Sequence, residues 1–426
     1  MKPRSFPNFS SAISIFILLA SPFLLTAQSN YRVQTLGELG GTSASANGIS
    51  DRGWITGAAN LPGDANSMAA LWLNGTAIPL GTLENGPNSA VAWPVKANNG
   101  IIVGISELPE LDPLGENFSC WPFVGTAVPT GRICQGFKWQ NGNLTALPPF
   151  PGGYSSYATG VNNRGQIVGW AENGVHDSTC DTTMQILQFR AVIWQPDGVM
   201  QELPPLPGDS TSAATAINDL GQVVGISGDC GIAVGSVSAR HAVLWENGVP
   251  RNLGNIGGDA WNTPTAINNQ GVIVGFANLT PGTARNFEAF IWTASAGMKS
   301  LHKITGDLRS EALDINEKGQ IVGLSRGGPH TFRAVLWQNG QLFDMNDLTS
   351  PGSPFLVLAG SIDSQGHIVG EALNTDTLES PAFIATPVPP GERDAASAAS
   401  DRNVRVPDSV RRHLEQRLGL ASELIP

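Results

Sequence analysis

One pattern of hydrophobic and polar positions recurs seven times along the chain. A small apolar segment leads into a polar turn rich in Asn, Asp and Gly, and a second apolar segment ends in glycine, as in AINNQGVIVG at residues 266–275. Asn and Asp bond their own backbone and Gly accepts a positive φ, so each copy predicts a hairpin between two strands. The copies end at Gly57, Gly104, Gly169, Gly225, Gly275, Gly323 and Gly370. A period of about 50 residues predicts a repeat architecture.

A third apolar segment follows each hairpin and ends in tryptophan in six of the seven copies, as in AVLWENG from Ala242. The Asn-Gly pair after it indicates a second hairpin and a fourth strand. Packing between neighbouring sheets is the simplest role for these side chains. The tryptophans are Trp72, Trp139, Trp194, Trp245, Trp292 and Trp337.

Four antiparallel strands per copy predict one blade of a propeller, whose faces are covered by its neighbours. The seventh copy has three strands before the segment PVPP at 387–390, while YRVQTLGEL at 31–39 has the pattern of an unpaired fourth strand. We expect this N-terminal strand to complete the last blade, which closes the ring and leaves no sheet edge open. The sequence therefore predicts an all-β fold, a seven-bladed β-propeller over residues 31–390.

Composition agrees with this fold and adds a prediction about export. The chain of 426 residues has 50 glycines, 30 prolines and 14% charged residues, which is typical of short strands separated by turns. Residues 1–28 combine a basic start with an apolar run and small residues, so they predict a signal peptide cut between Ala27 and Ser29. An uncleaved membrane anchor is the alternative. We expect a secreted protein, periplasmic or extracellular, with no membrane span after cleavage.

The net charge limits the class of binding partner, and the cysteines indicate the redox state of the compartment. Loss of Lys2 and Arg4 with the signal peptide moves the formal charge from −11 to −13, which argues against nucleic acid as a partner. Four cysteines fit two disulfides in an oxidising compartment. We expect Cys120 to pair with Cys134 and Cys180 with Cys230, although two bonds allow three connectivities.

Alternating strand directions place the variable loops at one rim of the propeller. The insertions after Gly104, Gly169 and Gly225 lie there with the connections between blades, and long loops on a rigid scaffold often bind ligands. Aromatic faces beside short polar groups suit sugars, so this rim is a candidate site for an extracellular glycan or a protein partner. The alternative is that these residues only form tight turns and fill gaps. The candidates are Tyr154, Tyr157, Asp209, Asp259, Trp261, Trp121 and Trp170.

No sequence motif of a common enzyme occurs. The chain lacks G-x-S-x-G, H-E-x-x-H and C-x-x-C, its six histidines have no metal-ligand spacing, and its Asx turns lack the ligand pattern of a calcium loop. The sequence thus predicts no cofactor, no metal and no catalytic residue. Asp209, Asp259 and Glu311 could still meet at the mouth of the ring, so a glycan-active hydrolase or lyase is the alternative function.

The composition changes after the repeats. Residues 391–406 read as a flexible polar linker, and residues 407–426 as an amphipathic helix that begins at Pro407 and Asp408. Val410, Leu414 and Leu418 lie on one face of this helix. Docking on the propeller, disorder, or binding to a partner are the roles open to it.

The turn A-x-I-N-x-x-G-x-I-V-G, the strand H-A-V-L-W-x-N-G that begins at His241, and the L-G-x-L-G-G loops resemble the HAF repeat of bacterial extracellular proteins. The resemblance covers all seven copies. It implies export and a β-rich body, and it assigns no activity, catalytic residue or ligand. Some relatives end in a sorting signal with a membrane helix, which this chain does not show. We therefore predict a monomeric, non-catalytic binding or scaffold module.

Overall fold

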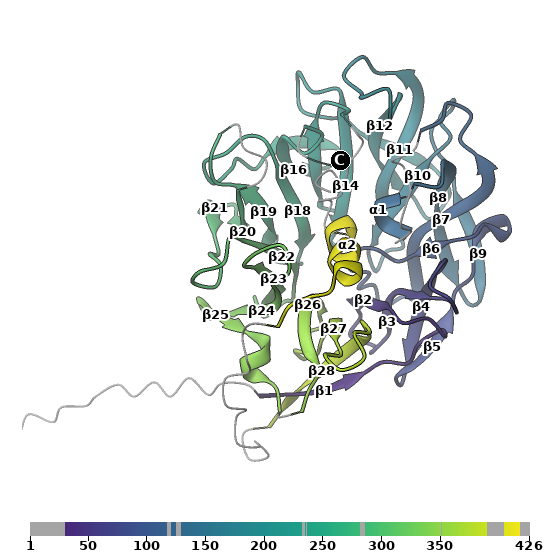
Figure 1. The fold of residues 1–426 in the computed structure, drawn as a ribbon. Coiled ribbons are helices and arrows are strands. Elements are labelled where there is room, and N and C mark those ends of the chain that lie inside the picture. The colour runs from purple at the N-terminus through teal and green to yellow at the C-terminus, as the bar shows by residue number, and fades with distance from the viewer. Residues whose placement is uncertain are drawn as a thin grey trace, which may run out of the picture.

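Seven four-stranded antiparallel sheets surround a central axis in the computed structural model, which describes residues 30–116, 121–124, 129–231, 235, 237–281, 286–350, 352–389 and 404–417 (Figure 1). The predicted seven-bladed propeller is confirmed. Blades 1 to 4 comprise β2 (Ala44–Ile49), β3 (Ile55–Asn60), β4 (Ser67–Leu73) and β5 (Thr76–Pro79); β6 (Ser89–Ala90), β7 (Ile101–Leu111), β8 (Arg132–Gln140) and β9 (Asn143–Leu147); β10 (Ser156–Val161), β11 (Ile167–His176), β12 (Leu187–Trp194) and β13 (Met200–Leu203); and β14 (Thr211–Ile217), β15 (Val223–Gly228), β16 (His241–Glu246) and β17 (Val249–Asn252). Blades 5 to 7 comprise β18 (Asn262–Ile267), β19 (Ile273–Asn278), β20 (Phe287–Thr293) and β21 (Gly297–Ser300); β22 (Arg309–Ile315), β23 (Ile321–Arg326), β24 (Phe332–Gln338) and β25 (Gln341–Asp344); and β26 (Phe355–Ile362), β27 (Ile368–Leu373) and β28 (Ala382–Val388) with β1 (Asn30–Thr35).

The N-terminal strand β1 closes the ring, as predicted. It pairs antiparallel with β28 over its whole length, from Asn30 opposite Val388 to Thr35 opposite Phe383. Tyr31 is buried at this seam, and burial together with the negative charge of Asp363 raises the pKa of its hydroxyl to about 12. The first and last strands of the propeller therefore share one sheet, and blade 7 has no unpaired outer edge at β28.

The glycine that ends each repeated motif is explained by a β-bulge. In blade 3 the register between β10 and β11 shifts between Ala158 and Gly160, and the carbonyl oxygen of Tyr157 then lies 1.7 Å from where a Cβ at Gly169 would stand. The corresponding distance in blade 4, from Gly225 to the Ala213 carbonyl, is 2.0 Å. A side chain at either position would require the inner strand to move.

The tryptophan that ends the third strand packs between blades and also joins them by a hydrogen bond. Trp245 is 1% exposed in an apolar cluster shared by blades 3 and 4, and its Nε1 donates to the Pro204 carbonyl of blade 3 at 2.8 Å. Trp72 and Trp337 donate in the same way to the preceding blade. These side chains are structural, which agrees with the role expected for them.

Blade 2 departs from the repeat. Its innermost strand β6 contains only Ser89 and Ala90, and the segment 95–100, expected to continue that strand, is not in a strand. Lys96 stands at the position that Ile267 holds in blade 5, and its side chain reaches across the axis instead of packing between blades. A long charged side chain in place of an apolar one thus accompanies the loss of the strand.

Two short helices and two 3-10 turns complete the described chain. They are α1 (Trp121–Val124), α2 (Asp408–Arg417), η1 (Leu83–Asn85) and η2 (Met345–Leu348). Among the described residues there is no helix of the length and hydrophobicity needed to cross a membrane. The helix predicted near Asp408 is present, and Figure 1 shows α2 over the centre of the ring of blades.

Candidate functional site

The channel along the propeller axis has two ends, which we call the lower and the upper mouth. The lower mouth is lined by the turns between first and second strands, such as 218–221, and the upper mouth by the connections between blades, such as 204–210. The candidate residues from the sequence belong to the upper mouth. Both ends carry polar groups that hold neighbouring blades together. A polar residue at either mouth is therefore not a ligand-binding residue by its position alone.

At the lower mouth, the Asn that begins four of the seven turns holds its own turn and the next one. Asn218 Oδ1 accepts hydrogen bonds from the backbone N–H groups of Leu220 and Gln222, at 3.1 and 3.0 Å. Its Nδ2 donates to the Asn268 carbonyl in the next blade at 3.0 Å. Asn162, Asn268 and Asn316 make the same contacts with the blades that follow them. The recurring Asn-x-x-Gly motif therefore links consecutive blades from blade 3 to blade 7.

The second residue of each turn adds an outer set of bonds between blades. The Asn163 N–H donates to Asp219 Oδ1 at 2.8 Å, the Asp219 N–H to Asn269 Oδ1 at 2.9 Å, and the Asn269 N–H to Glu317 Oε1 at 2.9 Å. The acidic side chains of this mouth thus already accept protein hydrogen bonds. Within the part of the chain that the structure describes, no cluster of His, Cys, Asp and Glu is suited to a metal ion.

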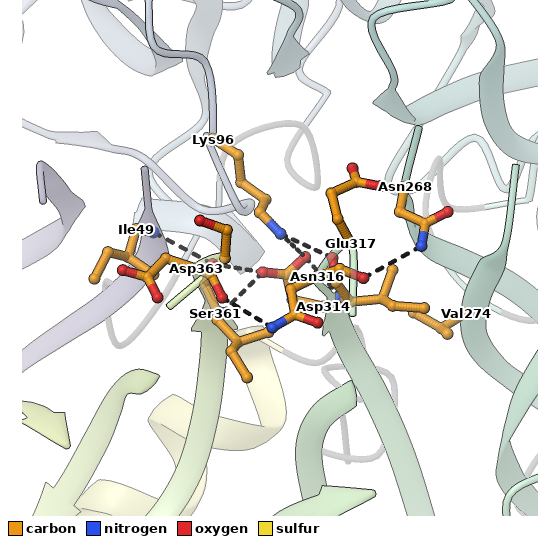
Figure 2. A network of polar contacts seen from close by, with 12 residues as sticks. Ile49, Lys96, Asn268, Val274, Asp314, Asn316, Glu317, Ser361 and Asp363 are labelled. Atoms are coloured by element: carbon orange, nitrogen blue, oxygen red, sulfur yellow. Dashed lines mark hydrogen bonds and ion pairs between the residues drawn. The ribbon is translucent and has the colours of Figure 1, made fainter. Parts of the chain in front are cut away.

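A cavity of about 180 Å³ opens inside this ring and is spanned by one ion pair. Lys96 from blade 2 reaches Asp314 of blade 6, with Nζ 3.1 Å from Oδ1, and also donates to the Ile315 carbonyl at 2.8 Å (Figure 2). Asp314 is fully buried and accepts further hydrogen bonds from Ser361 Oγ at 2.6 Å and the Ile362 N–H at 2.9 Å. The pair fastens opposite sides of the channel.

At the upper mouth, the serine that opens the innermost strand also joins two blades. Ser156 Oγ donates to the Leu147 carbonyl at 2.6 Å and accepts from the Gly136 N–H at 3.1 Å, and both partners belong to the preceding blade. Ser212 and Ser310 make the equivalent pairs of bonds. These hydroxyl groups join neighbouring blades. This role agrees with the alternative that the residues of these loops only form turns and fill gaps.

Three of the aromatic candidates lie in a buried cluster. Tyr157, Trp170 and Trp261 are 3%, 3% and 5% exposed. Tyr157 stacks on Trp170 with ring centroids 4.6 Å apart, whereas Trp261 meets Phe276 edge to face at 5.7 Å. Their faces are covered by protein rather than presented to solvent.

The remaining candidates are placed differently. Tyr154 is 37% exposed and Asp259 is exposed at the rim. The Trp121 side chain and Cys120 lie outside the described residues. The structure thus brings together Tyr157, Trp170 and Trp261 in one apolar cluster, and leaves Tyr154 and Asp259 on the surface around it.

Helix α2 covers this cluster. Val410 and Leu414 are 6% and 0% exposed and belong to the same apolar cluster as Trp170 and Trp261. The expected face of the helix therefore packs on the propeller, while Leu418 lies outside the described residues. The backbone before the helix is held too, because the Val406 N–H donates to the His330 carbonyl at 2.9 Å.

Charged groups anchor the other side of α2. Glu415 of the helix pairs with Arg326 at the end of β23, and the two side chains are 2% and 8% exposed. Arg411 of the helix contacts the second oxygen of Glu415 at 2.6 Å. The Arg326–Glu415 pair constrains the position of the helix, because removal of Glu415 would leave the buried charge of Arg326 without this counterion.

Asp209, a candidate for binding or for catalysis, has a structural environment. Its Oδ2 accepts from Ser227 Oγ at 2.6 Å and lies 2.8 Å from His241 Nδ1. Blade 6 repeats the arrangement with Ser325 and Asp307, at 2.6 Å, and an arginine in place of the histidine, at 3.5 Å. Because two blades repeat it with different basic partners, the Ser-Asp-His group is an element of the blade rather than a catalytic triad.

Two buried carboxyl groups, which the sequence did not predict, lie together beside blade 3. Glu116, from the insertion after β7, and Glu172, from β11, are 1% and 2% exposed and are hydrogen-bonded to each other. Burial raises the pKa of Glu172 well above its usual 4.5, and the neighbouring Glu116 raises that pKa further. Glu116 Oε1 accepts from the backbone of Leu187 at 2.6 Å, and Glu172 Oε2 from that of Ser155 at 2.8 Å. The pair fastens the insertion to blade 3, and the raised pKa means that Glu172 holds its proton more tightly than a free carboxyl group does.

One disulfide joins two insertions of the upper mouth. Cys180 of blade 3 and Cys230 of blade 4 are bonded, as predicted. Cys134 is disulfide-bonded as well, but the expected partner Cys120 falls outside the described residues.

The chain matches no family model and no curated protein. Among solved structures it is similar to a virginiamycin B lyase from Staphylococcus aureus, with 13% identity and a TM-score of 0.47 over 84% of this chain and 100% of that one. It is also similar to the β-propeller domain of the Trilobed protease from Pyrococcus furiosus, with 8% identity and a TM-score of 0.42 over 88% and 98% of the two chains. The SapL1 lectin, in complex with alpha methyl fucoside, has 11% identity and a TM-score of 0.35 over 75% and 98%. The propeller assignment rests on the sheet topology itself.

Proposed function

We propose that this protein is a non-catalytic binding module whose upper mouth binds an amphipathic helical segment of a protein partner. The observation that carries the proposal is the seating of α2, whose apolar residues Val410 and Leu414 pack among Trp170 and Trp261. The mouth thus already accommodates a helix with apolar residues four positions apart and an acidic residue that pairs with Arg326. Helices of this kind commonly bind in apolar grooves of partner proteins.

A glycan site on the same rim has less support. Stacking of a sugar requires an exposed aromatic face, and the Tyr157, Trp170 and Trp261 rings are 3% to 5% exposed with α2 in place. The hydroxyl groups of Ser156 and Ser212 at this mouth donate hydrogen bonds to the preceding blades. Among the aromatic candidates whose side chains the structure describes, Tyr154 is the exposed one, at 37%.

The enzyme alternative also has little support. Asp209 is bound by Ser227 and His241 in an arrangement that blade 6 repeats without the histidine. Asp259 is exposed on a loop, whereas Glu311 lies buried on an innermost strand. The coupled carboxylates Glu116 and Glu172 bond to backbone N–H groups and are almost completely buried, so a substrate would have no access to them.

Export to an oxidising compartment forms part of the proposal. It is supported by the signal-like segment 1–28, by the resemblance to the HAF repeat, and by the Cys180–Cys230 disulfide.

The test uses the full chain and a labelled peptide of residues 404–426. In the wild-type protein α2 occupies the mouth at a high effective concentration, so the peptide should bind weakly. The Val410→Asp, Leu414→Asp variant should release α2 and bind the peptide at least ~100-fold more tightly. Ser409→Asp, on the exposed side of α2, is the matched control and should behave like wild type. Fluorescence anisotropy measures the affinity, and failure of the folded double variant to bind the peptide would contradict the proposal.

A further inference from the structure

Arg326 gives the upper mouth a positive charge at the end of β23, where it contacts α2 through Glu415. It stands three positions after the glycine that ends each repeated motif. The other six copies carry no basic residue at this position, and the seven residues in chain order are Asn60, Glu107, Glu172, Gly228, Asn278, Arg326 and Leu373. Blade 6 therefore differs from every other blade in the charge that it carries at this position.

Contacts within blade 6 hold the Arg326 side chain in place. Its guanidinium carbon lies 4.8 Å from the centroid of the Phe332 ring, and its Nε donates to the Gly328 carbonyl at 3.2 Å. Phe332 begins β24 and belongs to the apolar cluster that α2 joins, whereas Gly328 lies in the loop between β23 and β24. Neither contact involves α2. The propeller itself therefore orients the guanidinium group for a ligand, and less ordering is needed on binding.

The two terminal nitrogens of Arg326 are used unequally by α2. Nη2 pairs with Oε1 of Glu415, whereas Nη1 is buried and has no hydrogen-bond partner among the residues that the structure describes. The second oxygen of Glu415 is bound by Arg411 of the helix itself at 2.6 Å. A carboxylate can accept hydrogen bonds from two nitrogens of one arginine at once. The mouth therefore offers a carboxylate one donor more than α2 uses.

A second arginine increases the positive charge beside this site. Arg309 of β22 lies directly opposite Arg326 in the antiparallel pair of strands, and its guanidinium carbon is 5.2 Å from the centroid of the Phe287 ring. Residues directly opposite each other share one face of a sheet, and like charges there destabilise each other. A carboxylate bound to Arg326 reduces this repulsion, so the charge at this end of blade 6 favours an acidic ligand.

We propose that Arg326 is the specificity-determining residue of the upper mouth, and that it selects a partner helix with a Glu or Asp directly after the second of two apolar residues spaced four positions apart. Val410, Leu414 and Glu415 of α2 have this pattern. This selectivity rests on the proposed binding of a helix and names the chemistry of the partner. A helix with a neutral or basic residue at that position would cover the guanidinium group without supplying a counterion, which disfavours its binding.

The first measurement compares labelled peptides of residues 404–426 on one receptor, the full-length Val410→Asp, Leu414→Asp variant from which α2 is released. The Glu415→Gln peptide should bind at least ~10-fold more weakly than the wild-type peptide, because the amide cannot neutralise the buried guanidinium group. The Asp408→Asn peptide is the matched control and should bind within roughly 3-fold of wild type, since the Asp408 side chain is 65% exposed. Equal affinities of the Glu415→Gln and wild-type peptides would overturn the proposal.

The second measurement changes the receptor. Arg326→Gln in the same background should weaken binding of the wild-type peptide by at least ~10-fold, whereas the affinity for the Glu415→Gln peptide should change by less than roughly 3-fold. A structural role alone would weaken both peptides equally, and that result would overturn the proposal. Arg32→Gln, at an exposed position of β1, is the control and should change neither affinity. The comparison of peptides keeps Arg326 intact, so it decides the proposal even if Arg326→Gln does not fold.

The outcomes separate this selectivity from the binding of a helix as such. Fluorescence anisotropy measures all of these affinities. Tight binding of both the wild-type and the Glu415→Gln peptides would leave the proposed function standing and overturn the role of Arg326. Binding of none of the peptides to the folded receptor would overturn both.

Discussion

Asn218 illustrates how one side chain can serve two blades. Its Oδ1 bonds to two N–H groups of its own turn, and its Nδ2 bonds to the Asn268 carbonyl of the next blade, while the side chain is 4% exposed. A shorter side chain would leave donors and an acceptor without partners where water has little access, and that costs more than the loss of the bonds alone.

The Asn218→Ala variant should accordingly lose about 2–4 kcal/mol of unfolding free energy. Leu220, in the same turn, is 61% exposed, and Leu220→Ala is the matched control, with an expected change within about 0.5 kcal/mol. Urea denaturation monitored by tryptophan fluorescence measures both. Equal effects of the two substitutions would show that the contact between blades is not what the repeated Asn contributes.

The insertion after β7 is fixed to blade 3 by two carboxyl groups, those of Glu116 and Glu172. In the folded protein, burial and the neighbouring Glu116 raise the pKa of Glu172 well above the usual 4.5. The folded state therefore holds the proton more tightly than the unfolded chain does. The stability that comes from this proton is complete below about pH 4.5 and is lost as the pH rises through the raised pKa of the folded protein.

Glu172→Gln should remove this dependence, because the amide keeps the shape of the protonated acid and has no proton to lose. We expect the variant to gain stability relative to wild type as the pH is raised from 5 to about 9, with each unit of pKa difference equivalent to about 1.4 kcal/mol. Unfolding free energies at several pH values measure the effect. Glu110→Gln, at an exposed position, is the control, and a pH-independent difference between Glu172→Gln and wild type would rule out a raised pKa of Glu172.

The elements that the sequence predicts are those with local signals. The Asx turns, the tryptophan strands and the unpaired N-terminal strand together define seven blades and the closure of β1 on β28. The destination of α2 has no local signal, because the polar composition of residues 391–406 predicts a linker that specifies no position for the helix, and the apolar stripe of Val410 and Leu414 fits many surfaces. Burial of Tyr157, Trp170 and Trp261 depends on contacts with rings from other strands and from α1, which no local pattern specifies.

Contacts between charged side chains of different blades were missed for a different reason. Glu116 and Glu172 lie on an insertion and on a strand, with no spacing that relates them. Lys96 and Asp314, by contrast, can be recognised in the sequence. Lys96 replaces the Ile of the repeated Ala-Ile-Asn motif, and Asp314 replaces the Ala. Two opposite charges at positions of this motif that are uncharged in the other copies indicate a pair across the channel, but which pair meets depends on the geometry of the closed ring.

The Lys96–Asp314 pair acts on the scale of the whole ring, since it joins blade 2 to blade 6 across the channel. Asp314 has no exposed surface, and three further donors, on Ile315, Ser361 and Ile362, keep it bound when Lys96 is absent. Lys96 is 34% exposed, so part of its charge is screened by solvent. Lys96→Met should therefore cost only about 1–2 kcal/mol of unfolding free energy.

In the Asp314→Ala background, where the residue becomes the alanine found at the equivalent positions 216 and 266, the same Lys96→Met substitution should cost about 0.5 kcal/mol or less. The difference between the two costs is the coupling across the channel, and urea denaturation of the four proteins of this cycle measures it. Additive effects would mean that the two side chains are neighbours without stabilising each other. The closed ring would then depend on the β1–β28 seam and on the contacts between adjacent blades alone.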